Sequence, residues 1–248
     1  MISKSIPKGK SFYTGRPEDT QAVYLTPNNY PVAADGIGDD SDALQQAINS
    51  IPFGIVFIPE GRYRISRTIY VPKAIRLIGY GKNRPVIVLG ENTPGFQIAD
   101  PNDKGKACYM IWFIDKHAKP GEPIHDANPG TFYSALSNID LVIEDGNPEA
   151  VALRTHFAQH GFVSHSDIHI GNGKAGIFDV GNEIEDVRFF GGEYGIYTTK
   201  PSPGWPFLMV DTFFEGQRKA AIQTREGGLT IVRMEVRNVP TVIDTDPH

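Results

Sequence analysis

The 248-residue sequence has one cysteine, two tryptophans and no long apolar run. A single thiol, Cys108, excludes an internal disulfide framework. No segment approaches the ~18 consecutive apolar residues of a membrane span. Residues 1–10 carry lysines and a proline but no apolar signal-peptide core. A net charge of −5 gives no electrostatic case for nucleic acid. We therefore expect neither a membrane nor a nucleic-acid partner.

Turn-forming residues are abundant, with 26 glycines and 19 prolines. Because 40% of the residues are apolar and 21% are charged, the composition excludes disorder, collagen and coiled coil. From residue 54 onward, short β-branched runs alternate with Gly, Pro and Asn, a pattern typical of strands. The predicted strands of this stretch are residues 55–58, 63–65, 68–71, 75–79 and 86–90. Residues 116–130 are rich in proline and glycine and predict a long projecting loop.

One short helix is predicted over residues 42–50. Asp39, Asp40 and Ser41 offer N-cap oxygens before it, and apolar residues recur inside it at helical spacing. We expect one domain, in which residues 1–53 form an N-terminal cap region and residues 54–248 form β-coils.

The second half of the chain contains a repeat. Each unit starts with a strand, passes through a Gly- or Asn-containing turn and ends on an aliphatic residue. A period of about 20–25 residues without helices indicates a solenoid of β-coils. We predict an all-β fold, a single-stranded right-handed parallel β-helix with a short capping helix. The five units are residues 137–153, 165–177, 183–196, 208–222 and 229–243.

No capping element follows the last unit, because the sequence stops at residue 248 just after it. We expect the final coil to expose its apolar side. A missing C-terminal part or second half, a partner subunit or an oligomer contact could cover it.

Residues 34–48 and 56–65 resemble the N-terminal signature of the pectate-lyase superfamily of right-handed β-helices. Within that superfamily, residues 181–196 look most similar to the N-terminal β-helix of glycoside hydrolase family 55 exo-β-1,3-glucanases. This resemblance implies a carbohydrate-active protein that is extracellular or periplasmic, although no signal peptide is visible. It also implies a catalytic acid in a second β-helix, for which this chain has no room. The motifs of polygalacturonases and pectate lyases are not found.

Candidate catalytic residues come from strand alternation, which points one aspartate of each repeat outward. In-register stacking would place these carboxylates about 4.8 Å apart, a spacing compatible with a glycosidase pair. The alternative is that each aspartate binds the backbone at a coil corner. The row consists of Asp140, Asp167, Asp186 and Asp211, with Arg233 in the fifth unit.

Further candidates lie beside turns or in loops. Glu193 and Glu215 could join Asp167, Asp186 and Asp211 in catalysis. Trp205, in a proline-rich loop, could stack on a sugar, and Arg188, Lys219 and His169 could bind substrate. The histidines near Asp167 have no known zinc spacing, so we expect no metal and no cofactor.

The predicted function is a glycoside hydrolase acting on a β-glucan or similar polysaccharide. Two alternatives stay open. A polysaccharide lyase would use Arg188, Lys219 or His169 as its base. A non-catalytic protein could be a carbohydrate-binding or tailspike-like β-helix, or one half of a two-helix enzyme.

Overall fold

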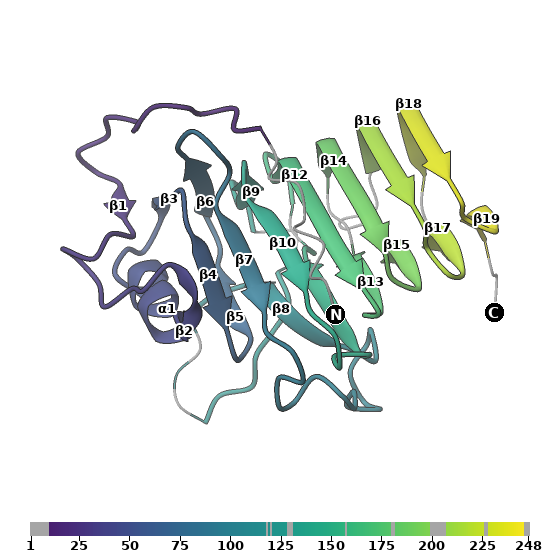
Figure 1. The fold of residues 1–248 in the computed structure, drawn as a ribbon, viewed down its shortest axis with the longest axis horizontal. Coiled ribbons are helices and arrows are strands. Elements are labelled where there is room, and N and C mark those ends of the chain that lie inside the picture. Colours follow the sequence, from purple (N-terminus) through teal and green to yellow (C-terminus); the bar gives the residue numbers. More distant parts are fainter. Residues whose placement is uncertain are drawn as a thin grey trace.

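The computed structural model describes residues 10–117, 119, 121–127, 131–156, 158–179, 182–198, 207–225 and 228–245. The chain winds into a β-solenoid of about eight coils, stacked along the long axis of the molecule (Figure 1). All strand pairs between named strands are parallel, and the described residues include one short helix. The predicted parallel β-helix is therefore confirmed. In the described ranges, no helix is both long and apolar enough to cross a membrane.

The strands form two sheets, of 12 and 7 strands. The larger sheet contains β1 (Val23–Tyr24), β2 (Asp35–Asp39), β3 (Gly54–Pro59), β4 (Arg62–Ile65), β6 (Ile75–Tyr80), β7 (Val86–Leu89), β9 (Ala135–Ser137), β10 (Asp140–Ile143), β12 (Phe162–Gly171), β14 (Glu183–Gly191), β16 (Phe207–Glu215) and β18 (Leu229–Arg237). The smaller sheet contains β5 (Ile69–Pro72), β8 (Cys108–Ile114), β11 (Ala150–Arg154), β13 (Ala175–Phe178), β15 (Tyr194–Thr198), β17 (Ala220–Thr224) and β19 (Thr241–Asp244).

Each of the four long strands of the larger sheet contains one non-glycine residue in the left-handed region of φ. The first part of β12 pairs with β9 and its last part pairs with β10. One long strand in this coil therefore takes the place of two shorter strands in the coil before it. A single left-handed residue turns the chain at this junction. We call these positions the corner residues; they are His165, Asp186, Asp211 and Arg233, with φ of 51°, 50°, 51° and 55°.

The core consists of aliphatic and aromatic files that run along the solenoid. Phe189 and Phe214 stack with centroids 4.7 Å apart and planes within 8°. The aliphatic ends of all five predicted repeats lie in register with one another in the smaller sheet, which confirms the repeat. This file consists of Ile69, Ile111, Leu153, Ile177, Ile196, Ile222 and Ile243.

The helix α1 (Ser41–Asn49) closes one end of the solenoid, one residue earlier than predicted at each end. The Gln45 side chain donates to the Tyr70 carbonyl at 2.8 Å and accepts from the Tyr70 N–H at 2.9 Å. The helix thereby satisfies the backbone N–H and carbonyl of Tyr70 in β5, an edge strand of the smaller sheet. Asp40 is the N-cap residue but makes no capping bond with its side chain; its carboxylate accepts from Ala33 and Ala34 instead.

The opposite end of the solenoid is formed by β18 and β19 (Figure 1). Val242 and Ile243 of β19 are 45% and 38% exposed, whereas Ile222, one coil earlier, is 1% exposed. The described part of the last coil therefore has the partly exposed apolar side expected from the sequence.

Candidate functional site

The outward aspartates of the larger sheet lie in two files, not one. Asp167 is in register with Arg188 and lies beside Asp140. Asp186 and Asp211 are corner residues, and each lies two residues before the position in its strand that is in register with Asp167. The prediction of a single in-register row is therefore wrong. The prediction assumed that side chains alternate strictly between inward and outward along each strand. The left-handed corner residue breaks this alternation.

Guanidinium groups pair with the aspartates of the first file. Arg84 lies 3.0 Å from Asp140 and 2.9 Å from Asp167, and all three side chains are 4% exposed. Arg188 adds a two-point contact to Asp167, with Nε at 2.7 Å from Oδ1. Each buried carboxylate is thus balanced by a cation, an arrangement that holds neighbouring coils together.

The corner aspartates are also paired. Arg233 contacts both carboxylate oxygens of Asp211 and lowers the pKa of that carboxyl. His165 Nδ1 lies 2.9 Å from Asp186. The catalytic roles expected for Asp167, Asp186 and Asp211 stay predictions, and the ion pairs give each of these residues a structural task.

The remaining predicted site residues of the larger sheet, His169 and Glu215, do not contact each other. His169 stacks on Phe190 at 4.7 Å, and burial lowers the pKa of its imidazole. Glu215 ends β16, in register with Phe190 and Arg237. Trp205 lies outside the described residues.

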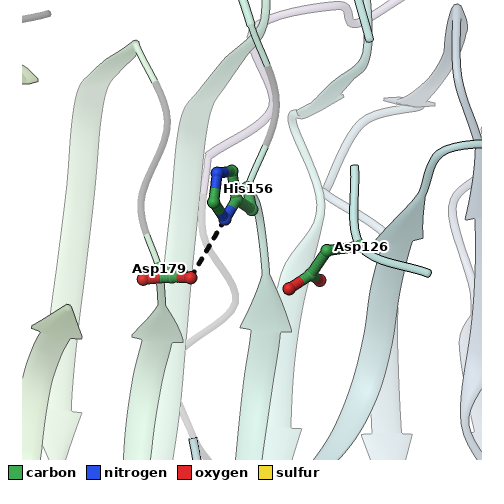
Figure 2. Close-up of side chains that lie close together, drawn as sticks. All are labelled: Asp126, His156 and Asp179. Atoms are coloured by element: carbon green, nitrogen blue, oxygen red, sulfur yellow. Dashed lines mark hydrogen bonds and ion pairs between the residues drawn. The ribbon is translucent and has the colours of Figure 1, made fainter. Parts of the chain in front are cut away.

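A different group of titratable side chains lies at the carboxyl ends of the strands of the smaller sheet. Figure 2 shows Asp126, His156 and Asp179 pointing toward one another, with one ligand atom of each within 4.8 Å of the other two. Asp179 directly follows β13, and His156 comes two residues after β11. Asp126 belongs to the loop predicted to project, but this segment returns to pair with Ile114. We call these three residues the acid–histidine cluster.

Asp179 is the most buried member of the acid–histidine cluster, with a side chain that is 0% exposed. Burial alone would raise the pKa of this carboxyl. Hydrogen bonds from His156, at 3.0 Å, and from Lys104 outweigh that effect and lower the pKa to about 2. Asp179 is therefore an anion at every pH at which proteins are normally handled.

Asp126 is held by Arg154, whose side chain is 5% exposed. The guanidinium binds both oxygens of Asp126, at 2.7 and 2.6 Å, and Asp103 at 2.6 Å. It also lies over the rings of Trp112 and Tyr109, at 4.2 and 4.7 Å from their centroids. Two carboxylates and an imidazole could ligate a metal ion. Lys104 and Arg154 already supply the positive charge that these carboxylates require, so the donor set fits an ion poorly.

Residues 98–107, which we call the strap loop, cross the outward face of the smaller sheet. Asp103 accepts from the Tyr109 hydroxyl at 2.5 Å, and the Tyr197 hydroxyl donates to the Gly105 carbonyl at 2.5 Å. A Cβ at Gly105 would lie 2.1 Å from the Tyr109 hydroxyl, so only glycine allows this approach. Burial raises the pKa of both tyrosines, which stay neutral donors.

The strap loop separates two clefts. One, of about 480 Å³, contains two tyrosines, two glutamates and five cations. The other, of about 440 Å³, is lined by Trp112, Tyr109 and two aspartates, with no cation among its described lining residues. The charged residues and tyrosines that line the cleft of about 480 Å³ are Lys104, Lys106, Lys174, Lys219, Arg225, Glu149, Glu193, Tyr194 and Tyr197.

The larger cleft brings together two residues predicted from the sequence, Glu193 and Lys219, whose side chains pair at 2.7 Å. Lys174 pairs with Glu149 at 3.0 Å. Within the described ranges, Lys106 and Arg225 have no carboxylate within ion-pair distance. The half-buried ring of Tyr194, beside cations that have no carboxylate partner in the described ranges, suits a sugar polymer with negatively charged groups.

Comparison with known proteins agrees with this architecture. The sequence model of the family described as rhamnogalacturonase A/epimerase, pectate lyase-like, matches residues 28–244. The chain belongs to this family. No curated protein matches it. The likeness to the pectate-lyase superfamily is thereby confirmed, while the finer one to family 55 stays a prediction.

Solved structures share the fold of this pectate-lyase-like chain. The catalytic unit of a GH87 α-1,3-glucanase from Streptomyces thermodiastaticus is 15% identical, with a TM-score of 0.59 over 94% of this chain. ORF18 of Geobacillus virus E2 is 18% identical, with a TM-score of 0.57 over 88%. Escherichia coli YbhC is 15% identical, with a TM-score of 0.53 over 91%, and is covered to 66%. This chain spans 43% and 41% of the first two.

Most of the acid–histidine cluster of this pectate-lyase-like protein was not predicted from the sequence. His156 is one of the histidines near Asp167 in the sequence, and Asp126, Arg154 and Asp179 were not among the predicted site residues. One signal was available, because Arg154 and Asp179 each follow an aliphatic repeat end by one or two residues. Polar residues at the carboxyl ends of parallel strands converge on one edge of the sheet.

Proposed function

We propose that this chain binds a polysaccharide on the outward face of the smaller sheet and cleaves its glycosidic bonds by hydrolysis. The observation that carries the proposal is the acid–histidine cluster beside a cleft lined with tyrosines and cations. Family membership supports a carbohydrate-active protein, and the GH87 enzyme supports hydrolysis on the same fold.

The proposed chemistry divides between Asp179 and His156. A permanently ionised Asp179 can stabilise the positive charge that develops on the sugar ring when the glycosidic bond breaks. His156 is the member of the acid–histidine cluster whose side chain can donate a ring N–H proton. It would give its proton to the leaving sugar oxygen. Water then adds to the ring carbon and returns a proton to the imidazole.

The cleft favours an acidic polymer over the neutral β-glucan predicted from the resemblance. Five cations face two glutamates there, so the local charge is positive although the whole chain carries −5. Lys106 and Arg225 are the cations left to pair with uronate or other anionic groups. Because polysaccharides do not cross membranes freely, we propose an extracellular or periplasmic location.

The same cations support a second candidate reaction, elimination by a polysaccharide lyase. In this reaction His156 would remove the proton next to the uronate carboxylate, and the glycosidic bond would break to leave an unsaturated sugar. Lys104 would balance the negative charge that develops at the carboxylate.

Product mass separates the two reactions. The chain is incubated with uronic-acid polymers and neutral β-glucans, and soluble products are analysed by mass spectrometry. Hydrolysis gives products heavier by one water than the anhydro-sugar repeat, whereas elimination gives unsaturated products without that water. Asp179→Asn and His156→Ala should abolish either activity. Products that persist in both variants but disappear in Asp167→Asn would move the site to the larger sheet and refute the proposal.

A further inference from the structure

The strap loop covers groups on which the proposed reaction depends. The Asp179 side chain is 0% exposed, and the Lys104 ammonium of the loop contacts its carboxylate. The Arg154 side chain is 5% exposed and pairs with Asp103 of the loop. A sugar ring cannot contact groups that are covered in this way. A polymer that reacts at the acid–histidine cluster therefore requires the strap loop to move off the sheet.

Polar contacts hold the strap loop on the sheet, and the loop buries little apolar surface. Three successive residues supply a carboxylate, an ammonium and a carbonyl group; they are Asp103, Lys104 and Gly105. The Ile98 side chain, the largest apolar one of the loop, is 84% exposed, whereas Gly105 and Ala107 are buried. Segments with few buried apolar contacts open at a lower free-energy cost than the core. A ligand can therefore displace this loop without unfolding the solenoid.

The groups that bind the Asp103 carboxylate are suited to the carboxylate of an acidic sugar. Arg154 donates to one oxygen of Asp103 at 2.6 Å, and the Tyr109 hydroxyl donates to the other at 2.5 Å. The Phe178 ring lies beside them, 5.9 Å from the Tyr109 ring. A guanidinium, a neutral hydroxyl donor and aromatic rings together provide charge pairing, hydrogen bonding and ring contact for such a sugar. Arg154 also binds both oxygens of Asp126, so the guanidinium stays in place when the loop moves.

We propose that the strap loop is an autoinhibitory segment, in which the Asp103 carboxylate occupies on Arg154 the place of a uronate carboxylate of the substrate, an inference that rests on the proposed binding of an acidic polymer to this face. A uronate that displaces Asp103 takes over its contacts to Arg154 and Tyr109. Lys104 then leaves Asp179, which becomes accessible to the sugar. Because the polymer binds only the open form, it shifts the population toward that form.

Two substitutions destabilise the closed strap loop for different reasons. Asp103→Asn removes the charge that pairs with Arg154. Gly105→Ala keeps the charge but adds a Cβ, which would lie 2.1 Å from the Tyr109 hydroxyl and 2.8 Å from the Phe178 ring. Gly105 does not have a left-handed φ, so alanine adds no backbone strain of its own. Both variants should therefore populate the open form more than the wild type does.

Each variant has a matched control. Asp100→Asn removes an equal charge from an exposed position of the same loop, and asparagine can still accept the hydrogen bond from the Asn102 N–H. Gly15→Ala adds a methyl group where no atom lies within 4 Å. Circular dichroism verifies that all four variants keep the fold.

Opening and binding are measured separately, and neither measurement needs a reaction product. Hydrogen exchange of residues 98–107, followed by mass spectrometry, reports opening. Calorimetry with short oligomers of galacturonic acid and of mannuronic acid reports binding. Asp103→Asn and Gly105→Ala should each bind an oligomer about tenfold more tightly than the wild type, because a smaller fraction of the protein is closed. Exchange should be faster in both variants, and in the wild type it should become faster when the oligomer is added.

Several results would overturn the autoinhibition. An equal gain in Asp100→Asn would assign the tighter binding to net charge alone. Slower exchange of residues 98–107 with oligomer would mean that the sugar binds over a closed loop. Unchanged or weaker binding in either strap variant, or no binding of either oligomer to any variant, would refute it equally. The proposed hydrolysis fails on a different observation, the absence of products, and products from a neutral β-glucan without uronate binding would retain hydrolysis while refuting the autoinhibition.

Discussion

Replacing Asp179 with asparagine should make the stability of the protein less dependent on acid pH. Asp179 is buried and receives hydrogen bonds from His156 and Lys104, which lower its pKa from 3.8 to about 2. A carboxyl whose pKa is lower in the folded state stabilises the fold above its unfolded pKa. That stabilisation is lost as the pH falls from 3.8 through about 2.

The size of the effect follows from the two pKa values. One pKa unit corresponds to about 1.36 kcal/mol, so the wild-type protein gains about 2 kcal/mol from this carboxyl at neutral pH. Roughly half of that gain is lost by pH 3, because the unfolded chain then binds the proton and the folded one mostly does not. Asparagine has no charge to titrate, so the variant lacks this pH-dependent part.

Urea unfolding at a series of pH values between 3 and 7 measures the difference. The free-energy gap between wild type and Asp179→Asn should narrow by about 1 kcal/mol on going from pH 7 to pH 3. Asp42→Asn is the matched control, because the Asp42 side chain is 81% exposed and its ion pair with Arg67 lies in water. A gap for Asp179→Asn that is constant across this range would refute the reasoning.

Three further outcomes are expected. Arg154→Gln leaves Asp126 and Asp103 without their shared cation and should cost about 3 kcal/mol of unfolding free energy, measured in urea; a loss below 1 kcal/mol would contradict it. Phe214→Ala should cost about 3–5 kcal/mol because the ring is fully buried against Phe189, whereas Val242→Ala, at a 45% exposed site, should cost less than about 1 kcal/mol by the same assay. Lys106→Ala and Arg225→Ala should each weaken the binding of a uronic-acid polymer and flatten its salt dependence in calorimetry; unchanged binding in both would argue against an acidic ligand in this cleft.

The β-helix could be predicted from the sequence because its signals are local. Each coil needs an aliphatic residue at its inward position and a turn before the next strand, and both are visible within about 20–25 residues. Leu153, Ile177, Ile196, Ile222 and Ile243 were identified in this way and lie in register. The helix at residues 41–49 was equally visible, because its apolar spacing is a property of one short segment.

The outward aspartates were predicted less well, because their positions depend on backbone conformation. Strict alternation assumes an extended strand, and the left-handed residue in the middle of each long strand breaks it. Asp186 and Asp211 occupy that corner themselves, so they leave the file of Asp167. The residue types give no warning, since His165 and Arg233 take the same conformation at equivalent positions.

The sequence by itself determined the solenoid, its cap and the apolar files of its core, since each of these is a repeated short-range pattern. The tertiary structure alone decided which polar residues meet. Asp103, Asp126, Arg154 and Asp179 come from four separate segments, and the strap loop and the returning loop bring the first two onto the smaller sheet. Such contacts depend on loop paths between coils, and loop paths have no periodic signal in the sequence.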